Sequence, residues 1–169
     1  RHVAKWGGTA WDSVQGGVSS TVMGMQEYNS KLLVYGFFED FKQGGVTTVC
    51  NGIATYNPAT GLWEKLVPVG CSSGGVVWDV LQGSDGGMYI VGSFTSFNGI
   101  ACSGICRLKD GFVQAVGTGI SGHFSQAITS IAELGGVIYV GGNFTRLNGF
   151  LSKNFAAFTT AGDMVDVGY

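Results

Sequence analysis

The residues able to do acid–base or metal chemistry are few and scattered. The two histidines, His2 and His123, occupy non-equivalent positions, and neither has a second histidine at ligand spacing. The sequence has no His-Glu-x-x-His and no Cys-x-x-Cys pattern, the spacings that hold zinc or form thiol redox sites. We therefore predict a non-enzymatic protein with no catalytic residue, no cofactor and no metal ion.

One adjacent pair of carboxylates, Glu39-Asp40, is present. A calcium or glycosidase site would need further carboxylates converging on it. At the two corresponding places further along the chain the residues are Thr95-Ser96 and Thr145-Arg146, so no ring of acids forms. The pair is expected in a solvated loop, with a cation site as the alternative.

Four cysteines, Cys50, Cys71, Cys102 and Cys106, raise the question of disulfide pairing. We place Cys102 and Cys106 on one strand, about 13 Å apart at roughly 3.3 Å per residue, too far to bridge. Cys50 and Cys71 are expected at the same end of two adjacent antiparallel strands, so they are the favoured disulfide. Cys102 could compete for Cys71, and Cys106 is expected to be a buried free thiol.

Asn143-Phe144-Thr145 is the one N-glycosylation sequon of the chain. It also belongs to a repeated strand motif, so two interpretations stay open. The three residues could serve packing alone, or Asn143 could carry a glycan if the protein is eukaryotic and secreted.

The composition excludes several classes of protein. Thirty of the 169 residues are glycine, more than twice the usual share of about 7%. Charged residues make up 12% and apolar residues 45%, the opposite of a disordered composition. No apolar run approaches the roughly 20 residues that span a bilayer. The net charge of −2 and the scattered lysines and arginines give no footprint for nucleic acid or anionic lipid.

The chain repeats itself about every 50 residues. One segment recurs as Tyr-Gly-Phe-Phe at 35–38, Val-Gly-Ser-Phe at 91–94 and Gly-Gly-Asn-Phe at 141–144. Each repeat holds four short segments, and none keeps a helical period over ten residues, so we predict strands and no helix. The Asn-Gly pairs at 98–99 and 148–149 indicate hairpins, because both central residues of a type I′ turn need positive φ.

Four antiparallel strands in every repeat are the pattern of a β-propeller blade. Trp6, Tyr56 and Phe158 recur at one position and are expected to fill the space between blades. Glycines within the second strand, such as Gly92 and Gly142, are expected where backbones approach closely.

These residues resemble a known family. The strand Tyr-Val-Gly-Gly-Asn-Phe-Thr at 139–145, the Ile-Ala-x-Tyr block at 53–56 and the Trp-x-x-Leu at 63–66 are similar to kelch and galactose-oxidase-like propellers. The similarity is greatest to the branch found in bacterial and algal surface proteins and fungal cortical polarity-marker proteins. It covers essentially the whole chain and implies surface binding and assembly. The copper site of galactose oxidase is not implied, because its two tyrosines, two histidines and Tyr–Cys crosslink have no counterparts here.

We therefore predict one all-β domain over residues 1–169, with about three and a half blades in parts 1–18, 19–70, 71–120 and 121–169. Closed propellers have about four to eight blades, so the ring is incomplete unless the chain extends further or copies associate. Because the chain starts at Arg1, we expect an excerpt of a longer polypeptide.

The expected function is that of a structural or adhesive segment of an extracellular or cell-surface protein. It would bind protein partners or further copies of the same polypeptide, with no nucleic acid and no membrane insertion. A carbohydrate-binding propeller lectin, with glycans as partners, is the alternative. A third interpretation is part of a kelch or galactose-oxidase-like enzyme whose active site lies outside this segment.

Overall fold

The computed structural model describes residues 2–14, 16–122 and 125–168. All regular elements in these ranges are β-strands, every pairing between them is antiparallel, and no helix occurs there. The prediction of an all-β protein is thereby confirmed. No helix long and apolar enough to cross a membrane is present in the described part of the chain.

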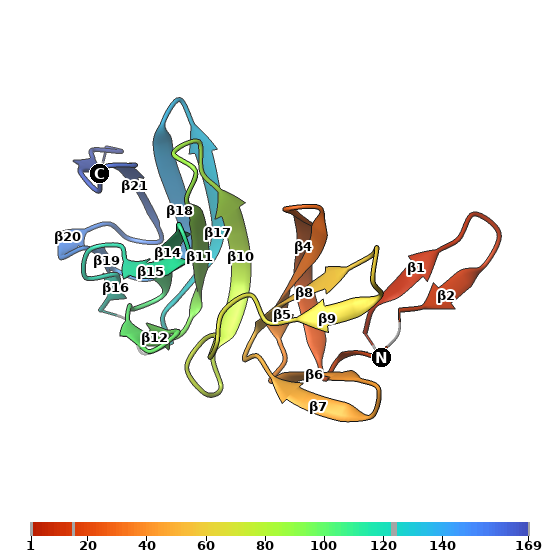
Figure 1. Ribbon diagram of the computed structural model, residues 1–169. Coiled ribbons are helices and arrows are strands. Elements are labelled where there is room, and N and C mark those ends of the chain that lie inside the picture. Colours follow the sequence, from red (N-terminus) through yellow and green to blue (C-terminus); the bar gives the residue numbers. More distant parts are fainter. Residues whose placement is uncertain (1, 15, 123–124, 169) are drawn as a thin grey trace.

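Three four-stranded sheets follow one another along the chain, and in each the strands are hydrogen-bonded in chain order (Figure 1). Sheet 1 contains β4 (Thr21–Tyr28), β5 (Lys31–Phe37), β8 (Ile53–Asn57) and β9 (Leu62–Glu64). Sheet 2 contains β10 (Val76–Gln82), β11 (Met88–Ser93), β14 (Ile105–Lys109) and β15 (Phe112–Ala115). Sheet 3 contains β17 (Ala127–Leu134), β18 (Val137–Asn143), β21 (Phe155–Thr159) and β22 (Met164–Val165). A hairpin of β1 (Ala4–Trp6) and β2 (Trp11–Ser13) precedes them.

A second set of short strands lies outside the large sheets, in the connections between the second and third strands and in the segments before the first strands of sheets 1 and 3. These are β3 (Gly17–Val18), β6 (Asp40–Gln43), β7 (Val46–Val49), β12 (Ser96–Phe97), β13 (Ile100–Ala101), β16 (Ile120–Ser121), β19 (Arg146–Leu147) and β20 (Phe150–Leu151). The sequence pattern predicted only their Asn-Gly turns, and those are confirmed. Asn98 and Asn148 have φ of 48° and 50°, with positive φ also at the glycine that follows each.

A β-bulge interrupts the first strand of every large sheet, in the steps Val22 to Gly24, Val77 to Asp79 and Ile128 to Ser130. The residue paired just before the bulge is always a glycine of the second strand: Gly36, Gly92 or Gly142. A Cβ at Gly92 would lie 2.0 Å from the carbonyl oxygen of Val76. At Gly142 the corresponding distance, to the Ala127 carbonyl oxygen, would be 2.2 Å. The predicted close approach at these two glycines is confirmed.

The hydrophobic core is divided into layers between successive sheets. Leu33 and Ile53 of sheet 1 pack with Val77 and Val80 of sheet 2. The next layer uses equivalent positions: Tyr89, Ile105, Ile128 and Ile131. A third layer packs residues near the N-terminus, Val3, Val14 and Val18, on Val34, Ala54 and Trp63 of sheet 1. Sheets 1 and 2 are thus buried on both faces, which is one reason why so few residues carry charge.

The three recurring aromatics differ in burial. Phe158 is fully buried and Tyr56 is half-buried, in agreement with their expected place between sheets. Trp6 is instead exposed, and its ring lies 5.5 Å from that of Trp11, centroid to centroid. The prediction therefore fails for Trp6, which lies in the separate two-stranded β1–β2 sheet and belongs to none of the core layers of the described structure.

Candidate functional site

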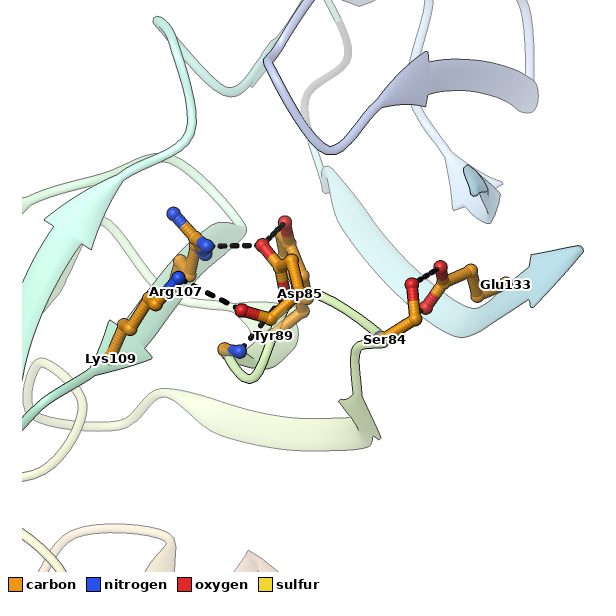
Figure 2. A network of polar contacts seen from close by, with 7 residues as sticks. Ser84, Asp85, Tyr89, Arg107, Lys109 and Glu133 are labelled. Carbon is orange, nitrogen blue, oxygen red and sulfur yellow. Dashed lines mark hydrogen bonds and ion pairs between the residues drawn. The ribbon is translucent and has the colours of Figure 1, made fainter. Parts of the chain in front are cut away.

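A network of charged and polar side chains lies at the turn between β10 and β11 (Figure 2). The Asp85 carboxylate accepts hydrogen bonds from the Gly87 amide at 2.9 Å and the Tyr89 hydroxyl at 3.0 Å. It also forms an ion pair with Arg107 of β14. The Lys109 ammonium donates to the backbone carbonyl of Asp85 at 2.8 Å. These contacts hold a carboxylate, a phenol and two cations together at one end of sheet 2.

The electrostatics of this network favour a fixed ion pair. Burial acts to raise the pKa of Asp85, but the Gly87 amide, the Tyr89 hydroxyl and the Arg107 and Lys109 charges outweigh it, so the pKa falls below its ordinary value. Burial, together with the hydrogen bond and the charge of Asp85, raises the pKa of Tyr89 to about 12. Neither group is therefore tuned to exchange a proton near neutral pH, as a general acid or base must be.

The same turn ties sheet 2 to both of its neighbours. The Ser84 backbone amide donates to a Glu133 carboxylate oxygen of β17 at 2.7 Å, and the Ser84 hydroxyl donates to the other oxygen (Figure 2). On the opposite side, the Gln82 amide group donates to the Glu27 carbonyl of β4 at 2.6 Å. Glu27, Gln82 and Glu133 occupy one register position in the three first strands.

Among the cavities lined by described residues, two that correspond to each other lie between neighbouring sheets, one on either side of the network. The cavity between sheets 1 and 2 measures about 350 Å³, and the one between sheets 2 and 3 about 220 Å³. They are equivalent by repeat, because Glu64 in the first and Gln114 in the second pair with the same position of the third strand. The polar side chains of the larger cavity include Lys31, Thr55, Glu64, Lys65, Lys109 and Asp110. The Lys31 ammonium donates to Glu64 at 2.5 Å.

The short strands present apolar side chains to solvent, at least one from each repeat. Val46 on β7, Ile100 on β13 and Phe150 on β20 are 65%, 41% and 61% exposed. Each begins the strand that follows the turn of its small hairpin. We call Val46, Ile100 and Phe150 the apolar row. Exposed apolar side chains mark an interaction surface where they form a contiguous patch.

The sequence-predicted histidine and carboxylate positions do not form a site. The His2 ring nitrogen Nδ1 lies 3.2 Å from the Val18 carbonyl oxygen, whereas His123 falls outside the described residues. The backbone amides of Glu39 and Asp40 both contact the Ser19 hydroxyl at 3.2 Å. Asp40 begins β6, so only Glu39 lies in the predicted loop. Among the described residues, no three His, Cys, Asp or Glu side chains are grouped as metal ligands.

All four cysteines are buried free thiols, so the favoured Cys50–Cys71 bridge is not formed in the structure. The chain does bring the two residues near each other, because the Cys71 amide donates to the Asn51 carbonyl at 2.9 Å. Their side chains, however, enter different core layers: Cys50 packs with Phe41, and Cys71 packs with sheet 2.

Cys102 and Cys106 do not share a strand, because β14 begins at Ile105 and Cys102 precedes the positive-φ residue Gly104. The chain turns between them and their thiols form a hydrogen bond, so the expected separation was wrong. That bond lowers the pKa of the Cys102 thiol against the opposing effect of burial. Burial raises the pKa of Cys106, which is a buried free thiol as expected.

Asn143 ends β18 and is exposed, with its side-chain amide donating to the Ser125 carbonyl at 2.8 Å. Phe144 is fully buried. The Thr145 hydroxyl donates to the Ser121 carbonyl at 3.3 Å. The sequon therefore contributes to packing, and its glycosylation stays a prediction.

One catalytic pattern was not recognised from the sequence: Gly-x-Ser-x-Gly at residues 70–74. In hydrolases this pattern forms a strand-to-helix turn that presents the serine. Here Ser72 lies in a loop before β10, and its hydroxyl accepts a hydrogen bond from the Thr95 amide at 3.2 Å. With no helix in the described ranges, the segment lacks the geometry of a nucleophile elbow.

No model of a known protein family matches the chain, and no curated protein is significantly similar to it.

Proposed function

We propose that the chain is a non-enzymatic structural or adhesive segment of a secreted or cell-surface propeller protein of the kelch-like type, and that it mediates protein–protein assembly. Sheets 1, 2 and 3 are then three blades, and the β1–β2 hairpin is the outer half of another. The recurring strand order, bulge and facing glycine support this assignment. The apolar layers between sheets support a stacked array, since repeat proteins are stabilised by neighbour contacts.

The observation that carries the adhesive role is the apolar row of Val46, Ile100 and Phe150. Each belongs to a short strand outside the large sheets, so its exposure serves no packing between those sheets. A surface in which every repeat contributes an exposed apolar side chain suits a protein partner that contacts several repeats at once.

The test is cell–cell aggregation by host cells that display the chain on their surface. Display of the parent chain should cause aggregation, and the variant V46S/I100S/F150S should reduce it at least tenfold at equal display. Phe112→Ser is the matched control, because Phe112 is exposed but lies outside the apolar row. Cells that remain dispersed with the parent chain, or that aggregate equally with both variants, would contradict an adhesive surface.

Carbohydrate binding is a second candidate, favoured by the larger cavity between sheets. Its volume of about 350 Å³ lies at the lower end of the range for small-molecule sites, about 300–1,000 Å³. Tyr28 and Asn29 line it beside Glu64 and Lys109, so an aromatic ring, an amide and charged groups surround one space. The equivalent cavity between sheets 2 and 3 means that the feature recurs.

A glycan array separates the two candidates. Carbohydrate binding predicts hits that are lost in Glu64→Gln and Asn29→Ala but retained in V46S/I100S/F150S. An array without hits, on a sample whose circular dichroism shows folded β-structure, would remove this candidate and leave the adhesive one.

A further inference from the structure

We propose that the outward face of sheet 3 is a docking surface for one more four-stranded antiparallel sheet of the same kind, with the first strand of that sheet lying across β18. We define this outward face by Ser130, Ala132, Leu134, Tyr139 and Phe155. The proposal rests on the assembly role proposed above and names the partner's chemistry. The partner's first strand carries β-branched residues on both sides of its bulge, as Val77 and Val80 do in sheet 2 and Ile128 and Ile131 do in sheet 3.

Two interfaces of this kind already exist within the chain. On sheet 1, Leu33 and Ile53 are fully buried beneath the first strand of sheet 2. On sheet 2, Tyr89 and Ile105 hold the same register positions and are fully buried beneath the first strand of sheet 3. The geometry of contact is therefore repeated, with the second and third strands of one sheet receiving the first strand of the next.

On sheet 3 the same register positions belong to Tyr139 and Phe155. Tyr139 is only half-buried and Phe155 is 45% exposed. Their rings stack with centroids 6.0 Å apart, which gives the face a flat aromatic centre. Leu134 is 74% exposed, whereas Tyr28, its counterpart on sheet 1, packs against the core beneath sheet 2. This face is thus apolar at the positions that the two internal interfaces bury.

Within the chain, a hydrogen bond between first strands helps to fix the register of one sheet against the next. The Asp79 carboxylate accepts a hydrogen bond from the Ile131 amide, just after the bulge of the next sheet, at 3.1 Å. Ser130 occupies the Asp79 position in sheet 3 and is exposed. Ser130 pairs with Gly141, which lies on the same face of β18 as Tyr139. A Cβ added to Gly141 would lie 2.9 Å from the Ser130 Oγ, so this hydroxyl is on the outward face. The Ser130 hydroxyl is therefore placed to accept the equivalent amide of an incoming strand.

A single repeat fits this face better than a second copy of the chain. A second copy would present β4 as its first strand, and Val22 and Met25 do stand at the required positions. It would also bring the β1–β2 hairpin, which lies beside β9 on the far side of sheet 1 (Figure 1). That hairpin corresponds to the last two strands of a sheet, so it would compete with β21 and β22 for one place.

The chain supplies a probe for the test. Residues 70–118, which contain sheet 2, are appended after Tyr169, because Thr118 and Tyr169 correspond in the repeat and the junction stays in register. Tyr139→Cys reports on the face through maleimide labelling, since the native thiols are all buried. Docking should lower the labelling rate at least tenfold relative to the unextended Y139C chain. The matched control has Val77→Ser and Val80→Ser in the appended copy alone and should keep the higher rate.

Phe112→Cys, outside the docking face, reports whether the extension changes labelling in general and should be unaffected. A joint thermal transition of the fusion indicates a docked repeat, and a separate transition for the appended repeat would contradict docking. Equal Y139C labelling in both fusions would overturn the proposal. If the labelling rate of Y139C in the unextended chain falls as protein concentration rises, a second copy of the chain covers this face and the proposal is overturned. The aggregation assay is independent, so either proposal can fail alone.

Discussion

Asp79 and Ile131 join the first strands of two neighbouring sheets, with the Asp79 Oδ2 atom accepting the Ile131 amide at 3.1 Å. The other carboxylate oxygen accepts from the Tyr35 hydroxyl of sheet 1 at 3.2 Å and from the Val80 amide at 2.9 Å. One side chain on β10 therefore contacts all three large sheets beside their bulges. Stacking is thus guided by polar contacts as well as by apolar layers.

Removal of this carboxylate should destabilise the whole array. Asp79→Ala leaves the Ile131 and Val80 amides and the Tyr35 hydroxyl without their acceptor, and an unpaired buried donor costs about 1–3 kcal/mol. We expect a loss in the free energy of unfolding within that range by urea denaturation. Tyr35→Phe removes one of the three bonds and should cost about 1 kcal/mol or less. An Asp79→Ala variant as stable as Tyr35→Phe would show that the bridge is unimportant.

High pH should destabilise the fold through two tyrosines. Burial, and then the nearby carboxylates Asp79 and Asp85, raise the pKa of Tyr35 and Tyr89 from 10.0 to about 12. A raised folded-state pKa contributes stability that is complete below pH 10 and is lost as pH rises toward 12. Urea unfolding at pH 8 to 12 should show this loss, and Y35F/Y89F should reduce its slope. A double variant with the parent slope would contradict these shifts.

Low pH acts through Asp85, with the opposite sign. The pKa of its carboxyl is lowered below the model-peptide value of 3.8, so its contribution to stability is present above that pH and is lost as pH falls below it. Asp85→Asn should make the unfolding free energy less sensitive to pH between 4 and 2. Glu39→Gln, at the predicted loop position, is the control and should retain the parent's acid sensitivity.

The sequence pattern predicted much of the fold because the repeat is local. Asn-Gly turns, alternating strands and the glycines facing each bulge are each specified by residues that lie close together in the sequence. The hairpin turns at Asn98-Gly99 and Asn148-Gly149 were predicted, but the strands beside them were not, because strands of two residues, such as β12 and β13, are too short to show alternation. The bend at Gly104 was missed for a related reason: one positive-φ glycine redirects the chain without changing its apolar pattern.

The candidate site was much less predictable. The Asp85 network combines a turn residue with Arg107, 22 positions away, and Ser84 meets Glu133 across 49 positions. Nothing in the spacing of these residues marks them as partners, since each contact depends on how one sheet rests on the next. The apolar row could have been found only by recognising the first residue after each small turn as a repeated position.

Free thiols should be detectable directly. Without reductant, the unfolded chain should titrate four thiols, whereas a Cys50–Cys71 disulfide would leave two. In the native state labelling should be slow, because burial raises the pKa of Cys50 to about 12 and of Cys71 to about 11. Cys102 should react first among the four, since its pKa is lowered by the bond with Cys106. Cys102→Ser should remove that earliest phase, and an unchanged first phase would contradict the assignment.

Gly92 offers the sharpest test of the bulge geometry. A methyl group there would meet the Val76 carbonyl oxygen at 2.0 Å and the Phe94 ring at 2.9 Å, so Gly92→Ala must displace backbone or ring. Overpacking of this kind costs about 1–3 kcal/mol, and we expect the upper part of that range by urea denaturation. Gly99→Ala is the control, because its Cβ would meet nothing within 4 Å and only its φ of 80° is unfavourable. That conformation costs about 1 kcal/mol, so equal losses at the two sites would mean that the bulge tolerates a side chain.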